Sequence, residues 1–221
     1  MKIFLDTANI ESIKKYNDMG IVDGITTNPT LLSKEKGNPA DIMSQIVKIV
    51  KGPVSLEVVA TTAAEMIEEA HKLKKYGQNV VVKIPMISEG LKAVKKLKSD
   101  GIETNVTLVF SSNQAILAAK AGARYVSPFI GRLDDAGQDG MSLIREIVQI
   151  FRNYQFDTNV LVASIRHPLH VIEAGKIGAQ VVTLPPDILG KMISHPLTDK
   201  GLSSFLSDWE KVKKNNPGLA I

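Results

Sequence analysis

The sequence predicts a (β/α)₈ barrel with an extra C-terminal helix, and three observations carry this prediction. Eight short apolar runs alternate with longer segments whose apolar residues recur near i, i+3, i+4 and i+7, as in amphipathic helices. The runs follow one another at about 25 residues per unit, which suits one strand, one helix and two short loops. Eight such units without a domain-boundary linker place residues 1–221 in a single barrel domain, near the short end of the usual size range.

The expected strands are the apolar runs, each bounded by polar or turn-forming residues. In chain order they are residues 3–5, 24–26, 56–60, 80–85, 105–110, 125–130, 159–164 and 180–185. The expected helices lie between them, at residues 10–19, 41–50, 63–76, 89–99, 113–122, 141–154, 168–178 and 187–194. Cap-like residues precede several helices (Asn9, Ser88, Ser111), and glycines follow others (Gly20, Gly77, Gly101, Gly122, Gly178).

A ninth helix is predicted within a C-terminal helix and tail at residues 197–221. Its apolar residues lie at helical spacing at Leu202, Phe205, Leu206, Trp209 and Val212. This face could pack on its own barrel or on a neighbouring subunit, and the sequence leaves both open. The alternative fold is a doubly wound open sheet, whose dinucleotide-binding versions are disfavoured because no G-x-G-x-x-G follows the first strand.

Composition excludes several classes of function. The chain has no Cys, which excludes a disulfide framework, a zinc-thiolate site and a thiol nucleophile. No uncharged apolar stretch reaches the ~18–20 residues of a membrane span, and the N-terminus lacks a signal-peptide pattern, so we expect a soluble, cytoplasmic protein without a membrane partner. The net charge is +4, but the lysines lie in short helical clusters without interleaved aromatics, which indicates solvated faces and no nucleic-acid partner.

The polar residues at the strand ends predict a site. In a barrel every strand delivers its C-terminal end to one face, so side chains far apart in sequence converge there. Lys83 is the strongest signal, because it interrupts an apolar parallel strand where an ammonium costs several kcal/mol unless it is paired or neutral. A neutral amine can attack a carbonyl and form a Schiff base, whereas the alternative is a plain salt bridge to Glu57 or Asp6.

The two carboxylates, Asp6 and Glu57, admit more than one role. Oxygen ligands suit Mg²⁺, but a neighbouring lysine disfavours a metal site, and we expect neither a metal nor a cofactor. Carboxylates beside an imine can instead move protons and position a water molecule. Asp6 alone could also be a turn or capping residue near the first helix.

Two arginines follow neighbouring strands and predict an anion site. Arg132 and Arg166 each come shortly after a small polar residue, Ser127 and Ser164 respectively. Two guanidinium groups at one barrel mouth suit a phosphate, which Arg holds with paired hydrogen bonds. The alternative for either residue is a surface ion pair, for instance between Arg132 and a following aspartate.

The histidines carry little signal. His167 and His170 are three residues apart at a helix start and could form half of a metal site, but no third ligand is suitably spaced. A serine-based triad is not indicated either, because G-x-S-x-G is absent.

Six segments taken together resemble the family of small transaldolases and fructose-6-phosphate aldolases. They are LDTAN at 5–9, GITTNPTLL at 24–32, VVVKIP at 80–85, EGLKAVKKL at 89–97, YVSPFIGR at 125–132 and VTLPPDIL at 182–189. The resemblance covers nearly the whole chain. It implies a Schiff-base barrel that needs no metal or cofactor and forms a homo-oligomer, a pentamer or a decamer of pentameric rings.

The resemblance also implies residue roles. Lys83 matches the Schiff-base lysine, Asp6 the acid/base of C–C cleavage, and Glu57 with Thr107 the pair that holds the catalytic water. The residues matching contacts to substrate hydroxyls are Asn28, Asn105 and Ser127, and those matching the phosphate site are Arg132, Ser164 and Arg166.

Two positions favour the transaldolase branch. The aldolase branch is expected to carry Gln where Glu57 stands and Tyr where Phe129 stands. A phenol near the bound enamine could help to protonate and release it, whereas Phe129 cannot. We therefore expect a pentose-phosphate-pathway transaldolase that moves dihydroxyacetone from sedoheptulose 7-phosphate or fructose 6-phosphate to erythrose 4-phosphate or glyceraldehyde 3-phosphate. The alternatives are an aldolase releasing free dihydroxyacetone and a non-catalytic sugar-phosphate binder.

Overall fold

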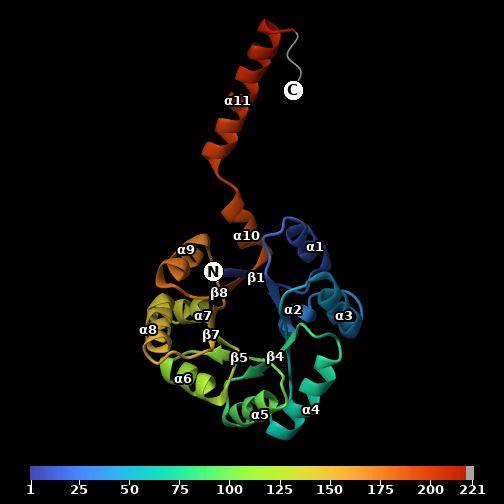
Figure 1. Cartoon of the computed structure of the whole chain (residues 1–221), viewed down its shortest axis with the longest axis vertical. Coiled ribbons are helices and arrows are strands. Elements are labelled where there is room, and N and C mark those ends of the chain that lie inside the picture. Colours follow the sequence, from blue (N-terminus) through green and yellow to red (C-terminus); the bar gives the residue numbers. More distant parts are fainter. Residues whose placement is uncertain (218–221) are drawn as a thin grey trace.

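The computed structural model describes residues 1–217, which form a closed parallel barrel with a projecting helix (Figure 1). Each strand pairs with its sequence neighbours, and the last strand closes the ring against the first. The strands are β1 (Lys2–Asp6), β2 (Gly24–Thr26), β3 (Val54–Glu57), β4 (Val80–Pro85), β5 (Thr104–Val109), β6 (Tyr125–Pro128), β7 (Asn159–Val162) and β8 (Val181–Leu184). The predicted (β/α)₈ barrel with an extra C-terminal helix is confirmed.

The helices surround the strands, except for α11, which projects from the barrel (Figure 1). They are α1 (Ile10–Asp18), α2 (Pro29–Leu32), α3 (Pro39–Ile49), α4 (Ala63–Lys74), α5 (Ser88–Ser99), α6 (Ser112–Ala121), α7 (Ile130–Asp135), α8 (Gly140–Asn153), α9 (Pro168–Ile177), α10 (Pro186–Ile193) and α11 (Pro196–Asn215). The short helices α2 and α7, which follow β2 and β6, were not predicted from the sequence. Both are too short to show a helical period of apolar residues.

Several boundaries differ from the sequence prediction. The third strand ends at Glu57 rather than at residue 60, and the sixth ends at Pro128 because the chain turns into α7. Ser164 has a left-handed backbone (φ +63°), and β7 ends before it, at Val162. Ser88 is the first residue of α5 and not its cap, which is Ile87. The caps predicted at Asn9 and Ser111 are confirmed, since both side chains accept a helix N–H.

The barrel interior has an apolar lower half, toward the N-terminal ends of the strands, and a polar upper half, at their C-terminal ends. The lower half is filled by a cluster of inward side chains consisting of Phe4, Val81, Tyr125, Leu161 and Val181, and Ala163 extends this cluster to the cavity. Phe4 lies opposite Gly24 in the register, and a Cβ on Gly24 would lie 2.7 Å from the Phe4 ring. Gly24 therefore leaves the space that the aromatic ring fills. The packed floor confines any ligand to the upper end.

The larger core lies between the strands and the surrounding helices. Ile13, Ile46, Met66, Leu97 and Ile144 are fully buried there, each from a different helix. This layer holds the strands in a fixed register, so the side chains at their C-terminal ends are presented on a rigid frame.

Helix α11 points away from the barrel, as the red helix in Figure 1 shows, and none of its residues is buried. Its apolar side chains are exposed, with Phe205 at 75% and Leu206 at 59%. The final residues of the predicted tail, 218–221, lie outside the described part of the chain. Between residues 1 and 217, no helix has both the length and the apolar character needed to cross a bilayer.

Candidate active site

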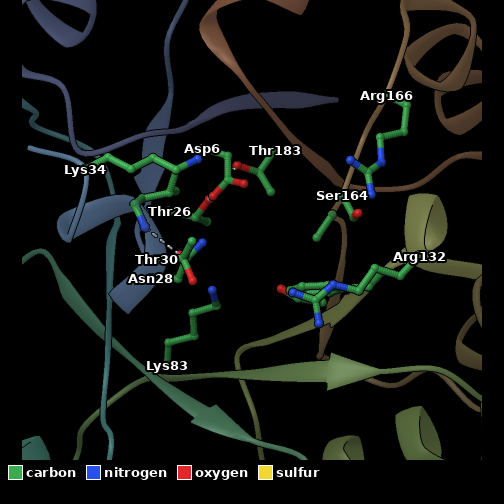
Figure 2. Close-up of a pocket in the computed structure, with 14 residues that line it drawn as sticks. Asp6, Thr26, Asn28, Thr30, Lys34, Lys83, Arg132, Ser164, Arg166 and Thr183 are labelled. Atoms are coloured by element: carbon green, nitrogen blue, oxygen red, sulfur yellow. Dashed lines mark hydrogen bonds between the residues drawn. The ribbon is translucent and has the colours of Figure 1, made fainter. Parts of the chain in front are cut away.

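A cavity of about 270 Å³ opens at the C-terminal ends of the strands (Figure 2). Its lining includes most of the predicted site residues: Asp6, Asn28, Lys83, Ser127, Phe129, Arg132, Ser164 and Arg166. The other three, Glu57, Asn105 and Thr107, lie on adjacent strands without lining the cavity. In Figure 2, Arg132, Ser164 and Arg166 lie on one side of the cavity, opposite Asp6 and Asn28.

Lys83 on β4 is buried (4% exposed), and its amine reaches the cavity. Its Nζ lies 2.9 Å from Oε2 of Glu57, the residue beside it in the register, and donates a hydrogen bond to the carbonyl of Thr27 at 3.1 Å. The Phe129 ring lies 5.9 Å from the amine. The salt bridge between Lys83 and Glu57 that the sequence suggested is thus present, and it holds the Lys83 amine at the base of the cavity.

Asp6 is held by the polar ends of its neighbouring strands. Its Oδ1 accepts a hydrogen bond from Thr26 Oγ1 at 2.8 Å, and Thr26 in turn lies 2.7 Å from the hydroxyl of Thr183. Burial raises the pKa of Asp6 above its ordinary value of 3.8, while the Lys83 charge and the Thr26 hydrogen bond oppose the shift. A carboxyl group with a raised pKa is suited to accepting and returning protons.

Asn105 belongs to a buried chain of hydrogen bonds across three strands. Its Nδ2 donates to Ser55 Oγ at 3.1 Å, and its Oδ1 accepts from Ser127 Oγ at 2.7 Å. Asn28 caps α2 by accepting from Leu31 N at 2.9 Å. These contacts fix the orientation of both amides, which matters for recognising hydroxyl groups.

Among the described residues, two buried oxygens on the strands that flank the Lys83 strand lack an aligned hydrogen-bond donor. They are Glu57 Oε2, whose contact with the Lys83 amine is a charge contact, and Thr107 Oγ1. Thr107 pairs with Pro85, two residues beyond Lys83 on β4. Leaving such a buried group unsatisfied costs about 1–3 kcal/mol, and a bound water is the usual partner.

The two arginines have different surroundings. Arg166 forms an ion pair with Asp135 at 2.6 Å. The guanidinium of Arg132 lies 4.9 Å from the centre of the Phe129 ring, and within residues 1–217 no carboxylate comes within 4.0 Å of it. The surface ion pair considered for Arg132 is therefore formed by Arg166 instead.

Gly131 allows the two arginine-bearing segments to approach closely. Its N–H donates to the carbonyl of Ser164 at 3.1 Å. A Cβ at this position would lie 2.2 Å from the Ser164 carbonyl oxygen and 2.5 Å from Arg166 Nε. A glycine at 131 is thus needed to keep Ser164 and both guanidinium groups around one space.

The structure adds lining residues that the sequence prediction did not include: Thr26, Thr30, Leu31, Lys34, Ala163 and Thr183. Lys34 lies just beyond α2, and its amine points toward the Asp6 side of the cavity (Figure 2). Thr26 and Thr183 are polar strand ends, which the rule that singled out Asp6 also places at this site, although the sequence assigned them no role. No sequence pattern marked Lys34, because α2 was not predicted.

Comparison with known proteins places this barrel in a family. A family model described as "Transaldolase/Fructose-6-phosphate aldolase" matches residues 3–216. The chain belongs to this family. It is similar to a protein of Nitrosopumilus maritimus named "Probable transaldolase", with 67% identity over the whole of both chains. Proteins of the same printed name from Thermoplasma volcanium (60% identity, 96% of each chain) and Moorella thermoacetica (59%, 96% of this chain and 99% of the other) are also similar. The resemblance seen in the sequence motifs is confirmed.

Proposed function

We propose that this protein is a transaldolase that transfers a dihydroxyacetone unit between sugar phosphates, as a cytoplasmic enzyme of the pentose phosphate pathway. The observation that carries the proposal is the buried Lys83 amine at the base of the cavity, with Asp6 and Glu57 beside it. The covalent intermediate forms on the Lys83 amine, and its formation requires no cofactor. The similar proteins carry the name "Probable transaldolase", which supports the transferase over the aldolase.

The proposed reaction starts on the ketone of sedoheptulose 7-phosphate or fructose 6-phosphate. Lys83 first passes a proton to the carboxylate of Glu57, which lies 2.9 Å from its Nζ. The resulting amine adds to C2, and loss of water from the carbinolamine gives a protonated imine. Asp6 then accepts the proton of the C4 hydroxyl while the C3–C4 bond breaks, and its electron pair moves onto the imine. An aldose phosphate leaves, and the three-carbon enamine stays on Lys83. Addition to erythrose 4-phosphate or glyceraldehyde 3-phosphate and hydrolysis of the imine complete the transfer.

Glu57 and Thr107 are proposed to hold the water that enters and leaves during these steps. Two observations support this role. Glu57 Oε2 lies beside the Lys83 amine, and Thr107 Oγ1 is buried without a hydrogen-bond donor among the described residues, a group for which a bound water is the usual partner. Asn28, Asn105 and Ser127 are proposed to bind the hydroxyls of the three-carbon unit. Ser127 and Asn28 line the cavity, and the Asn105–Ser127 hydrogen bond orients the pair from behind.

Arg132, Ser164 and Arg166 are proposed to bind the phosphate. They lie together on one side of the cavity, away from the Lys83 amine (Figure 2). Arg132 has no carboxylate partner within the described residues, which leaves its guanidinium available for an anion.

The test of the proposed function is whether cleavage requires an acceptor. With fructose 6-phosphate alone, we expect little free dihydroxyacetone, and addition of erythrose 4-phosphate should give steady turnover to sedoheptulose 7-phosphate. Phe129→Tyr places a phenol close to the enamine on Lys83 and should raise acceptor-independent release by about tenfold or more. Phe110→Tyr, on the neighbouring ring, is the matched control. Fast release by the wild type would favour the aldolase, and no turnover with either sugar would favour a binding protein.

We also propose that the protein is a homo-oligomer, a pentamer or a decamer, and that α11 contributes to its contacts. The exposed apolar side chains of this projecting helix support the proposal, because such a face is stabilised when it is covered. Light scattering should give a mass several times 24.0 kDa. The double variant Phe205→Asp/Leu206→Asp should lower this mass, whereas Lys211→Asp on the same helix should not. A 24.0 kDa species for the wild type at micromolar concentration would contradict the proposal.

A further inference from the structure

Two histidines lie directly behind the arginine side of the cavity, and the proposed reaction does not use them. His167 and His170 stack with their ring centres 3.7 Å apart. His170 is buried (7% exposed), whereas His167 is exposed. A buried histidine normally uses both ring nitrogens, so its partners indicate its role.

Both nitrogens of His170 contact the segments that carry the arginines. Its Nδ1 accepts a hydrogen bond from the backbone N–H of Arg166 at 3.4 Å. Its Nε2 lies 3.3 Å from Oδ2 of Asp134, on α7, the helix that contains Arg132. An accepting Nδ1 requires the neutral ring with its proton on Nε2, the nitrogen that lies against Asp134. Neutral His170 thus joins the Arg166 segment to α7.

Asp134 is itself fixed, so the connection is firm at both ends. Its other oxygen accepts from the N–H of Gly140, the first residue of α8, at 2.9 Å. On the opposite side, the Arg166 segment follows Ser164, whose left-handed backbone is strained for a residue with a side chain. A strained segment keeps its conformation only while neighbouring contacts hold it, and the His170–Arg166 hydrogen bond is one of these contacts.

The charged groups around His170 shift its pKa in opposite directions. Burial lowers the pKa of His170 below its ordinary value of 6.5, and the neighbouring His167 and Arg166 lower it further, whereas Asp134 and Glu173 raise it. The net effect keeps the ring neutral at neutral pH. When the pH falls far enough to protonate His170, Nδ1 gains a hydrogen that faces the Arg166 N–H, and two donors then oppose each other.

We propose that His170 is a positioning residue of the anion subsite: its neutral ring holds the Arg166 segment so that Arg132 and Arg166 face one anion, and its protonation weakens anion binding. This inference rests on the proposed function only in naming the anion as the phosphate of a sugar.

The test uses two variants of His170 whose side-chain amides each take the place of one nitrogen of the histidine ring. The Asn amide oxygen in His170→Asn reaches the place of Nδ1 and can still accept from Arg166 N, but does not titrate. The amide of His170→Gln reaches the place of Nε2 and loses the Arg166 contact. Inorganic sulfate is the probe, because it stays a dianion between about pH 5 and about pH 8, the range in which histidine titrates. Its binding is measured by calorimetry, with His167→Asn and the distant His71→Asn as controls.

The wild type and both controls should bind sulfate roughly tenfold more weakly at the acid end of this range than at the alkaline end. His170→Asn should bind with the alkaline affinity of the wild type and change by less than about twofold with pH. His170→Gln should bind roughly tenfold more weakly at both ends. If His170→Asn keeps the pH dependence of the wild type, or the wild type shows none, the proposal is overturned, whether or not the Gln variant folds.

A kinetic experiment separates this inference from the proposed function. In the transfer assay, His170→Gln should raise KM for fructose 6-phosphate roughly tenfold and leave kcat within about twofold. Borohydride trapping of unphosphorylated dihydroxyacetone on Lys83 should be unchanged. Absence of trapping in the wild type would contradict the Schiff-base proposal, while the sulfate titration would still decide on His170. Trapping in the wild type together with an unchanged KM in His170→Gln would contradict the His170 inference alone.

Discussion

Replacing Lys83 by Met should lower the rate of dihydroxyacetone transfer by at least about 10⁴-fold and abolish borohydride trapping. Met keeps the length and buried volume of the side chain but has no amine to form the imine. The base of the cavity contains no second lysine within the described residues, since the other lining lysine, Lys34, lies on its Asp6 side beyond α2. The expected loss of transfer rate therefore comes from the loss of imine formation itself.

The measurement is peptide mass mapping after treatment with fructose 6-phosphate and borohydride. The wild type should carry a reduced three-carbon adduct on the peptide that contains Lys83. Lys34→Met is the matched control: it removes an amine from the same cavity, and the adduct on Lys83 should persist. An adduct that forms in Lys83→Met at the rate of the wild type would refute the proposed mechanism.

The Lys83→Met variant also removes the partner of Glu57, and this could affect stability. Breaking a buried ion pair by deleting one side leaves an uncompensated charge, which typically costs several kcal/mol. The double variant Lys83→Met/Glu57→Gln removes both charges and should recover most of the lost unfolding free energy while remaining inactive. Recovery of stability without activity distinguishes the loss of chemistry from the loss of the fold.

The positions of the candidate site residues on the strands could be predicted from the sequence because the barrel makes strand order and register regular. Once β3, β4 and β5 are known to be parallel neighbours, their polar residues must meet: Glu57 pairs with Lys83, and Lys83 with Asn105. A polar residue in an apolar run is visible in the sequence itself. The same reasoning located Asp6 and Ser127 correctly at the site.

The parts of the site that depend on loops could not be predicted in this way. Lys34 reaches the cavity only because the four-residue helix α2 redirects the chain after Asn28, and so short a helix leaves no periodic pattern. The left-handed backbone of Ser164 has no local signal, because a serine rarely adopts it without support from its surroundings. The contacts of His170 join segments more than 30 residues apart, so its spacing from His167 suggested only half of a metal site.

Asp6→Asn should lower kcat for transfer by about 10²–10⁴-fold while leaving borohydride trapping of added dihydroxyacetone on Lys83 unchanged. An amide keeps the size of the side chain and can still accept from Thr26, but cannot take the C4 hydroxyl proton. For the wild type, the acid limb of kcat/KM should lie above 3.8, the ordinary pKa of Asp, because burial raises the pKa of this carboxyl. The variant should lack this limb. Loss of trapping in Asp6→Asn would assign Asp6 to imine formation instead of cleavage.

The same substitution should stabilise the fold at neutral pH. A carboxyl whose pKa is higher in the folded chain than in the unfolded chain binds its proton more tightly when folded, so ionising it costs stability. This cost is absent below about pH 3.8, grows as the pH rises from there to the raised pKa, and is constant above the raised pKa. Asp6→Asn should therefore unfold at a higher urea concentration than the wild type at pH 7. The substitution does not leave Lys83 without a partner, because Lys83 retains its contact with Glu57.

Asp187→Asn, which removes an exposed carboxylate from α10, should change neither activity nor stability. A lower urea midpoint for Asp6→Asn at pH 7 would show that the attraction between Asp6 and Lys83 outweighs the cost of burying the carboxylate.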